Sequence, residues 1–192
     1  MNAPAPAPFQ LMDESTAPQK SKPYLAQAKA AFGLIPNVEA VMAQAPSLLG
    51  AYMTAWDLFD ETSFSPVERQ IVYQTANFEN NCEYCQPWHT ILSENSGMPK
   101  HDVEALRQGC PLSNSKHEAL RIFAKDLVRT RGSIEPAALE AFVYAGYNEQ
   151  TALEVILGLS IKLMSNYTNA IAQTSLDIAA QGKKWSKPTL RG

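Results

Sequence analysis

A long helical pattern near the C-terminus constrains the fold more than any other feature of this sequence. From Glu149 to about Ile171, apolar residues recur at intervals of three and four, and Asn148 is placed to cap the first turn. The apolar stripe is too wide for a helix that exposes one whole face to water. We therefore expect this helix to lie centrally in the fold or at a contact between subunits.

The rest of the chain has helical signals of the same kind from Tyr24 onward. Ser65, Pro66 and Glu68 fit the N-cap, N1 and N3 positions of a helix that begins with a capping box, and Ser115 and Glu118 have the same spacing. The expected helices span residues 26–32, 38–44, 47–59, about 66–79, about 82–97, about 115–132, 133–144 and about 149–171. Runs of β-branched residues occur, but none is bounded by hairpin turns. The sequence predicts an all-α fold.

Length and composition favour one globular domain. The chain has 192 residues, of which 45% are hydrophobic and 18% charged, enough to bury a core. Residues 1–23 are expected to form a flexible Pro/Ala-rich tail, and residues 24–192 the single all-α domain. The net charge of −3 argues against a nucleic-acid surface. Neither a membrane-spanning run nor a secretory signal is visible, so we expect a cytoplasmic protein.

The stretch FENNCEYCQPWH, residues 78–89, contains two of the three cysteines and one of the three histidines. If a helix begins at Cys82, then Cys85 and His89 follow on the same face at i+3 and i+7, with Cys85 and His89 four residues apart. Unpaired backbone N–H groups in a first helical turn favour a thiolate, and a nearby imidazole can take its proton. The second thiol can then resolve an oxidised first thiol by forming a disulfide.

Three alternatives to redox catalysis remain open for this motif. A structural zinc site needs a fourth ligand, which only the distant His101 or Cys110 offer, and the spacing requires neither. In the second alternative the cysteines are inert core residues, since free cysteine is often buried. The third is a redox-sensing or binding module, in which the disulfide changes packing and turnover is negligible. Cys110 is most simply a loop thiol with no part in the chemistry.

The motif and its flanks resemble the carboxymuconolactone decarboxylase superfamily, in its alkylhydroperoxidase D-like, peroxidase-related branch. The resemblance covers roughly residues 32–185. It rests on Ser65-Pro66-x-Glu68-Arg69 followed by Asn81-Cys82-Glu83-Tyr84-Cys85-x-x-x-His89, with Phe32-Gly33-Leu34-Ile35-Pro36-Asn37 upstream and Lys162-Leu163-Met164-Ser165-Asn166-Tyr167-Thr168-Asn169 downstream. It implies an all-helical bundle that assembles into a dimer, trimer or hexamer.

The resemblance also implies a function and a role for each residue of the motif. Cys85 would attack a hydroperoxide, Cys82 would resolve the product, and His89 would belong to a proton relay. An external dithiol would reduce the resulting disulfide, and no metal or organic cofactor is involved. The expected protein is a thiol-dependent peroxidase-like oxidoreductase with an antioxidant role.

The sequence departs from the family pattern at two positions. The family relay has a glutamate twelve positions before the first cysteine, where this chain has Gln70, which cannot take a proton. Glu68 either replaces that acid or serves only in the capping box; the sequence does not decide. Pro87 falls inside the expected helix, so the helix either kinks there or begins only near Pro87.

Overall fold

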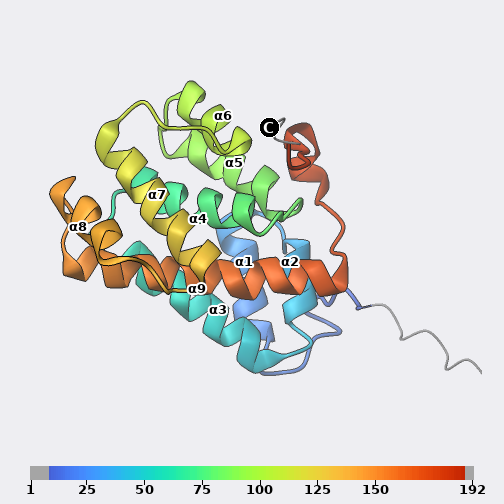
Figure 1. The fold of residues 1–192 in the computed structure, drawn as a ribbon. Coiled ribbons are helices and arrows are strands. Elements are labelled where there is room, and N and C mark those ends of the chain that lie inside the picture. Colours follow the sequence, from blue (N-terminus) through green and yellow to red (C-terminus); the bar gives the residue numbers. More distant parts are fainter. Residues whose placement is uncertain (1–8, 189–192) are drawn as a thin grey trace, which may run out of the picture.

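Helix α9, Glu149–Ala172, is the long element that crosses the middle of the view in this computed structural model, which describes residues 9–188 (Figure 1). It packs against α3 and α4 and also touches α2 and α7. Its start is as predicted. The Asn148 side chain accepts from the Thr151 N–H at 2.9 Å, and the Thr151 hydroxyl oxygen accepts from the Asn148 N–H at 2.9 Å.

The remaining elements are also helical, and the all-α prediction is confirmed. They are α1 (Lys22–Phe32), α2 (Asn37–Met42), α3 (Pro46–Asp60), α4 (Pro66–Glu79), α5 (Cys85–Asn95), α6 (Lys100–Gln108), α7 (Ser115–Thr130), α8 (Pro136–Tyr144) and a 3₁₀ helix, η1 (Ile178–Lys183). Residues 9–188 contain no strand and form one domain around α4, which touches α5, α6, α7 and α9. None of the helices in this range is both long and apolar enough to cross a membrane.

The start of α5 differs from the expectation and resolves the question of Pro87. Asn81 has φ of +54°, and the N–H groups of Asn81 and Cys82 donate to the carbonyls of Phe78 and Asn77, which closes α4 with a Schellman turn. The helix predicted from residue 82 therefore begins at Cys85. Pro87 then lies in the first turn, where no N–H has a partner within the helix, so it causes no kink.

Other helix starts were displaced or missed. Helix α1 begins at Lys22 and α8 at Pro136, where residues 26 and 133 were expected. Asn114 caps α7 by accepting from the N–H groups of Lys116 and His117, so the predicted Ser115 cap is displaced by one residue. Helix α6 was not predicted because it has only nine residues and a mostly polar sequence. It nevertheless buries Val103 and Leu106 against the core.

The N-terminal segment passes over α2 before α1 begins. Of the tail predicted over residues 1–23, residues 1–8 lie outside the described range, as do 189–192 at the other end of the predicted domain. The Met12 N–H donates to the Ala40 carbonyl at 3.0 Å, and the buried Ser21 hydroxyl donates to the Ala43 carbonyl at 2.7 Å. These bonds join residues 9–21 to α2, one wall of the candidate site.

Candidate functional site

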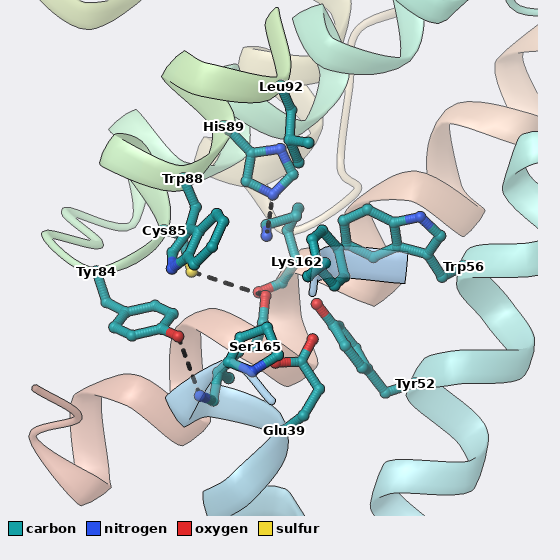
Figure 2. Close-up of a pocket in the computed structure, with 13 residues that line it drawn as sticks. Glu39, Tyr52, Trp56, Tyr84, Cys85, Trp88, His89, Leu92, Lys162 and Ser165 are labelled. Carbon is teal, nitrogen blue, oxygen red and sulfur yellow. Dashed lines mark hydrogen bonds between the residues drawn. The ribbon is translucent and has the colours of Figure 1, made fainter. Parts of the chain in front are cut away.

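The cysteine motif lies where α5 meets α9 and α2, beside a small, partly open cavity (Figure 2). The cavity has a volume of about 30 Å³, room for about two water molecules. Its lining is mainly aromatic and apolar, with the polar groups gathered around one sulfur atom. The lining residues are Phe32, Pro36, Val38, Glu39, Tyr52, Trp56, Tyr84, Cys85, Trp88, His89, Leu92, Lys162 and Ser165.

The Cys85 sulfur is surrounded by hydrogen-bond donors from α9. The side-chain amides of Asn166 and Asn169 donate to Sγ, each at 3.2 Å, and the Ser165 hydroxyl lies at 3.9 Å. Burial alone raises the pKa of this thiol. The hydrogen bond from the Cys82 thiol, the positive charge of Lys162 and the bonds from Asn166 and Ser165 outweigh burial and lower the Cys85 pKa to about 6. Cys85 is therefore mostly a thiolate at neutral pH.

Cys82 has the opposite protonation. It lies in the turn before α5, and the Cys85 backbone N–H donates to its sulfur at 3.3 Å. The hydrogen bond to Cys85, together with burial, raises the pKa of Cys82, so this residue stays a thiol. Both cysteines are reduced in the structure. The pair thus consists of one buried thiolate and one neighbouring thiol that donates to it.

His89 is buried and bonded through both ring nitrogens. Its Nε2 lies 2.9 Å from the Lys162 ammonium, and its Nδ1 lies 2.9 Å from the Gln70 amide oxygen. An ammonium can only donate, so Nε2 accepts and Nδ1 bears the proton that is donated to Gln70. Burial, aided by the charge of Lys162, holds the His89 pKa well below its ordinary value. In this arrangement the neutral ring fixes the position of Lys162 beside Cys85.

Glu68 lies in the capping box of α4, the second of the two roles open from the sequence. One carboxylate oxygen accepts from the Ser65 N–H at 2.9 Å and from its hydroxyl at 2.8 Å. The other accepts from the Tyr147 hydroxyl at 2.9 Å and pairs with Lys116. Burial raises its pKa, but the bonds from Ser65 and Tyr147 lower it by more. The carboxylate is fully engaged in these contacts and is absent from the cavity lining.

Glu39 is a cavity residue that sequence reasoning missed. Its side chain is 3% exposed and lines the cavity with Cys85 and Lys162, as Figure 2 shows. Within residues 9–188, its buried Oε2 atom has no hydrogen-bond partner. Burial, which exceeds the effect of the Lys162 charge, raises the Glu39 pKa to about 8. A carboxylic acid protonated at neutral pH therefore faces the same space as the thiolate. The sequence did contain one signal for Glu39, because it is the single acid within the otherwise apolar run Val38–Met42.

Helix α9 supplies more of the site than the sequence suggested. Two polar residues of this apolar helix, Asn166 and Asn169, are buried at its contact with the cysteine motif. Asn166 bonds to α4, with its amide donating to Asn77 Oδ1 at 2.9 Å, and both asparagines also donate to Cys85. Lys162, a lone cation in that helix, is 1% exposed and was not singled out.

The C-terminal segment braces the cavity wall through the buried carboxylate of Asp177. This carboxylate accepts from the Tyr84 hydroxyl, from Trp88 Nε1 at 2.9 Å and from the Asn37 N–H at 3.0 Å. The Tyr84 hydroxyl in turn accepts from the Val38 N–H at 3.1 Å. Tyr84 and Trp88 are wall residues of the cavity.

The two residues considered as a fourth zinc ligand lie elsewhere. Cys110 is exposed next to the Gln108 carbonyl, and His101 bonds to the Ser113 hydroxyl at 3.0 Å. Across residues 9–188, His, Cys, Asp and Glu side chains form no group of three or more with the geometry to hold a metal ion.

Comparison with known proteins establishes the fold. No protein-family model matches the chain, and no curated protein matches it. Among solved structures, the chain is similar to the alkylhydroperoxidase AhpD core of an uncharacterized peroxidase-related protein from Ralstonia eutropha JMP134. That match has a TM-score of 0.79 and 15% identity over 92% of this chain and 95% of that one. An uncharacterized peroxidase-related protein from Silicibacter sp. TM1040 matches with a TM-score of 0.77 and 19% identity, over 95% and 98% of the two chains.

A third similar structure is named as a debrominase and not as a peroxidase-related protein. The debrominase Bmp8, as a cysteine-to-alanine variant in complex with 2,3,4-tribromopyrrole, matches with a TM-score of 0.77 and 18% identity. The match covers 95% of this chain and 96% of that one. These likenesses show that the chain has the alkylhydroperoxidase D-like fold, as the sequence resemblance implied.

Proposed function

On this alkylhydroperoxidase D-like fold, we propose that the chain is a thiol-dependent oxidoreductase that reduces hydroperoxides through Cys85 and Cys82. The observation that supports this most is the environment of the Cys85 sulfur. Two asparagine amides and the Lys162 charge favour its thiolate, and a thiol lies beside it. A buried thiolate facing a cavity, with a resolving thiol next to it, is the arrangement that two-electron reduction of a peroxide requires.

The first step oxidises Cys85. Its thiolate attacks the distal oxygen of the hydroperoxide, a sulfur–oxygen bond forms, and the oxygen–oxygen bond breaks to release an alkoxide. The Glu39 carboxylic acid, which lines the same cavity and is protonated at neutral pH, gives its proton to that alkoxide. Glu39 thereby takes the place of the relay acid that Gln70 cannot supply. His89 has an indirect role, because it holds Lys162 in position beside Cys85.

The second step forms the disulfide. The Cys82 sulfur attacks the Cys85 sulfenic acid, a sulfur–sulfur bond forms, and hydroxide leaves with the Cys82 proton as water. An external dithiol then supplies two electrons and two protons. These protons restore the Cys82 thiol and the Glu39 acid, and Cys85 returns to its thiolate. The cycle balances without a metal or an organic cofactor.

The test is steady-state consumption of a panel of hydroperoxides with dithiothreitol as reductant. We expect many turnovers per protein chain, with small hydroperoxides preferred because the cavity is about 30 Å³. The Cys85→Ser variant should show none. Consumption of only one equivalent of hydroperoxide would contradict the proposal and favour the redox-sensing alternative.

A second candidate activity is thiol-dependent reductive dehalogenation. The aromatic faces of Tyr52, Trp56 and Trp88 in the cavity lining suit a flat, apolar ring, and a structural neighbour is a debrominase bound to a bromopyrrole. The small volume of the cavity ranks this activity below peroxide reduction. Bromide release from a bromopyrrole in the presence of dithiothreitol, measured beside peroxide consumption, distinguishes the two activities.

We also propose that the protein is a homo-oligomer in the cytoplasm. Five large apolar residues on α9 are exposed and recur at helical spacing: Leu153, Ile156, Leu163, Tyr167 and Ile171. A row of exposed apolar residues on one helix is typical of a subunit contact. Light scattering should therefore give a dimer, trimer or hexamer for the wild type.

A further inference from the structure

The two cysteines face different spaces. Cys85 lines the small aromatic cavity, whereas Cys82 lines a separate groove. That groove has a volume of about 360 Å³, more than ten times that of the cavity on the same measure. Tyr84, which lies between the two cysteines in sequence, is the one residue that both linings share.

The groove is lined by amide and hydroxyl groups. Its residues are Asn80, Asn81, Cys82, Glu83, Tyr84, Asn166, Asn169, Ala170, Gln173 and Thr174. Within residues 9–188, two buried oxygen atoms in this lining, Asn169 Oδ1 and Thr174 Oγ1, have no hydrogen-bond partner. Asn169 is 6% exposed and its amide nitrogen is already bonded to Cys85. Two residues of the lining thus contain a buried oxygen that no group within residues 9–188 pairs.

We propose that this groove is the binding site of the reductant, a polar dithiol that enters beside Cys82 while the substrate reaches Cys85 from the aromatic cavity. The inference rests on the proposed redox cycle and assigns its two half-reactions to two separate spaces beside the motif. The groove volume falls in the range of small-molecule sites, and its polar lining suits hydroxyl or amide groups on the reductant.

The chemistry of disulfide exchange favours the same direction of attack. A thiolate of the dithiol attacks the Cys82 sulfur, the Cys82–Cys85 bond breaks, and Cys85 leaves as a thiolate. Exchange is faster when the leaving thiol has the lower pKa, and that of Cys85 is lowered while that of Cys82 is raised. The second thiol of the reductant then attacks the mixed disulfide, closes its own disulfide, and releases Cys82, which takes up a proton.

The first experiment maps the mixed disulfide on the wild-type protein. The protein is oxidised with diamide, which does not depend on any peroxidase activity, and is then exposed briefly to 2-mercaptoethanol. Free thiols are alkylated at low pH, and fragmentation between the two cysteines locates each mass. We expect the mercaptoethanol adduct on Cys82 and the alkyl group on Cys85. An adduct on Cys85 overturns the proposal.

The second experiment fills the groove. Ala170 is an exposed α9 residue of the lining, and Ala170→Trp places an indole there. The matched control is Ala137→Trp, at an exposed position in the first turn of α8. Both variants are compared with the wild type only after light scattering shows that all three proteins have the same molecular mass in solution. Reduction of the diamide-oxidised protein by dithiothreitol should slow at least tenfold in Ala170→Trp and stay within twofold in Ala137→Trp.

The two half-reactions separate this inference from the proposed function. Oxidation by one equivalent of hydroperoxide should stay within twofold of the wild type in Ala170→Trp. If that variant slows both half-reactions equally, or leaves reduction unchanged, the groove is not the route of the reductant. If hydroperoxide fails to oxidise even the wild type while the diamide experiments behave as expected, the proposed function is wrong and the assignment of the groove stands.

Discussion

Replacing Lys162 with methionine tests the electrostatic basis of the site. Lys162 is 1% exposed, and its charge is the second-largest of the influences that lower the Cys85 pKa, after the hydrogen bond from Cys82. Methionine keeps a similar length and volume but removes the positive charge. The substitution therefore changes the field at the sulfur while the cavity keeps its shape.

The size of the effect follows from the thiolate fraction. The surroundings lower the Cys85 pKa from 9.0 to about 6 against the opposing effect of burial. Loss of Lys162 should raise it by about one unit or more, about 1.4 kcal/mol in favour of the thiol. At pH 6 the thiolate fraction then falls from about one half to about one tenth, a loss of about fivefold in the rate of oxidation. Near pH 9 both proteins are almost fully ionised and the rates converge.

The assay is absorbance of the thiolate at 240 nm against pH, together with the rate of oxidation by hydroperoxide at each pH. Lys100→Met, at an exposed position at the start of α6, is the control and should titrate as the wild type does. If Lys162→Met leaves the titration unchanged, the positive charge does not stabilise the Cys85 thiolate, and the account of the low pKa is wrong.

Four other predictions concern single residues. Glu39→Gln should slow oxidation at neutral pH by about a hundredfold or more, as loss of a general acid does. Because folding raises the Glu39 pKa to about 8, its stabilising effect is present below its ordinary pKa and is lost as pH rises to 8. Glu39→Gln should therefore gain stability over the wild type from pH 5 to pH 8, by up to roughly 5 kcal/mol in denaturant titrations; no gain would mean that the acid is not buried as described. Glu68→Ala should lower the free energy of unfolding by about 1 kcal/mol and leave the thiolate titration unchanged, whereas a shifted titration would return Glu68 to the relay. His89→Ala should raise the pKa of Cys85 through a displaced Lys162, and an unchanged thiolate titration would remove His89 from the site. Leu163→Glu, in the exposed apolar stripe of α9, should lower the mass measured by light scattering, and an unchanged mass would place the subunit contact elsewhere.

The sequence predicted the helices whose signals are local. The capping box at Ser65 and Glu68 and the cap at Asn148 are present as expected, since each needs only residues within one turn. The start of α5 was misplaced because Asn81 adopts a left-handed conformation, which asparagine tolerates but does not require. Helix α6 was missed because it has only nine residues and a mostly polar sequence.

The candidate site was predictable only in part for a similar reason. Cys82, Cys85 and His89 lie within eight residues of the sequence, so their spacing and the family resemblance identified them. Glu39 and Lys162 lie far from the motif along the chain, and only packing of α2 and α9 against α5 brings them to the cavity. A single sequence contains no signal for such long-range proximity beyond an acid or a cation in an apolar helix.

The measurement that tests the central claim most directly is trapping of the oxidised sulfur. The Cys82→Ser variant keeps a hydroxyl donor beside Cys85 but cannot form the disulfide. After one equivalent of hydroperoxide, a dimedone-type probe should label Cys85 in this variant, and mass spectrometry should locate the adduct there. Labelling that appears instead in Cys85→Ser, on Cys82, would reverse the assigned roles, and labelling of neither cysteine would contradict the proposed peroxide chemistry.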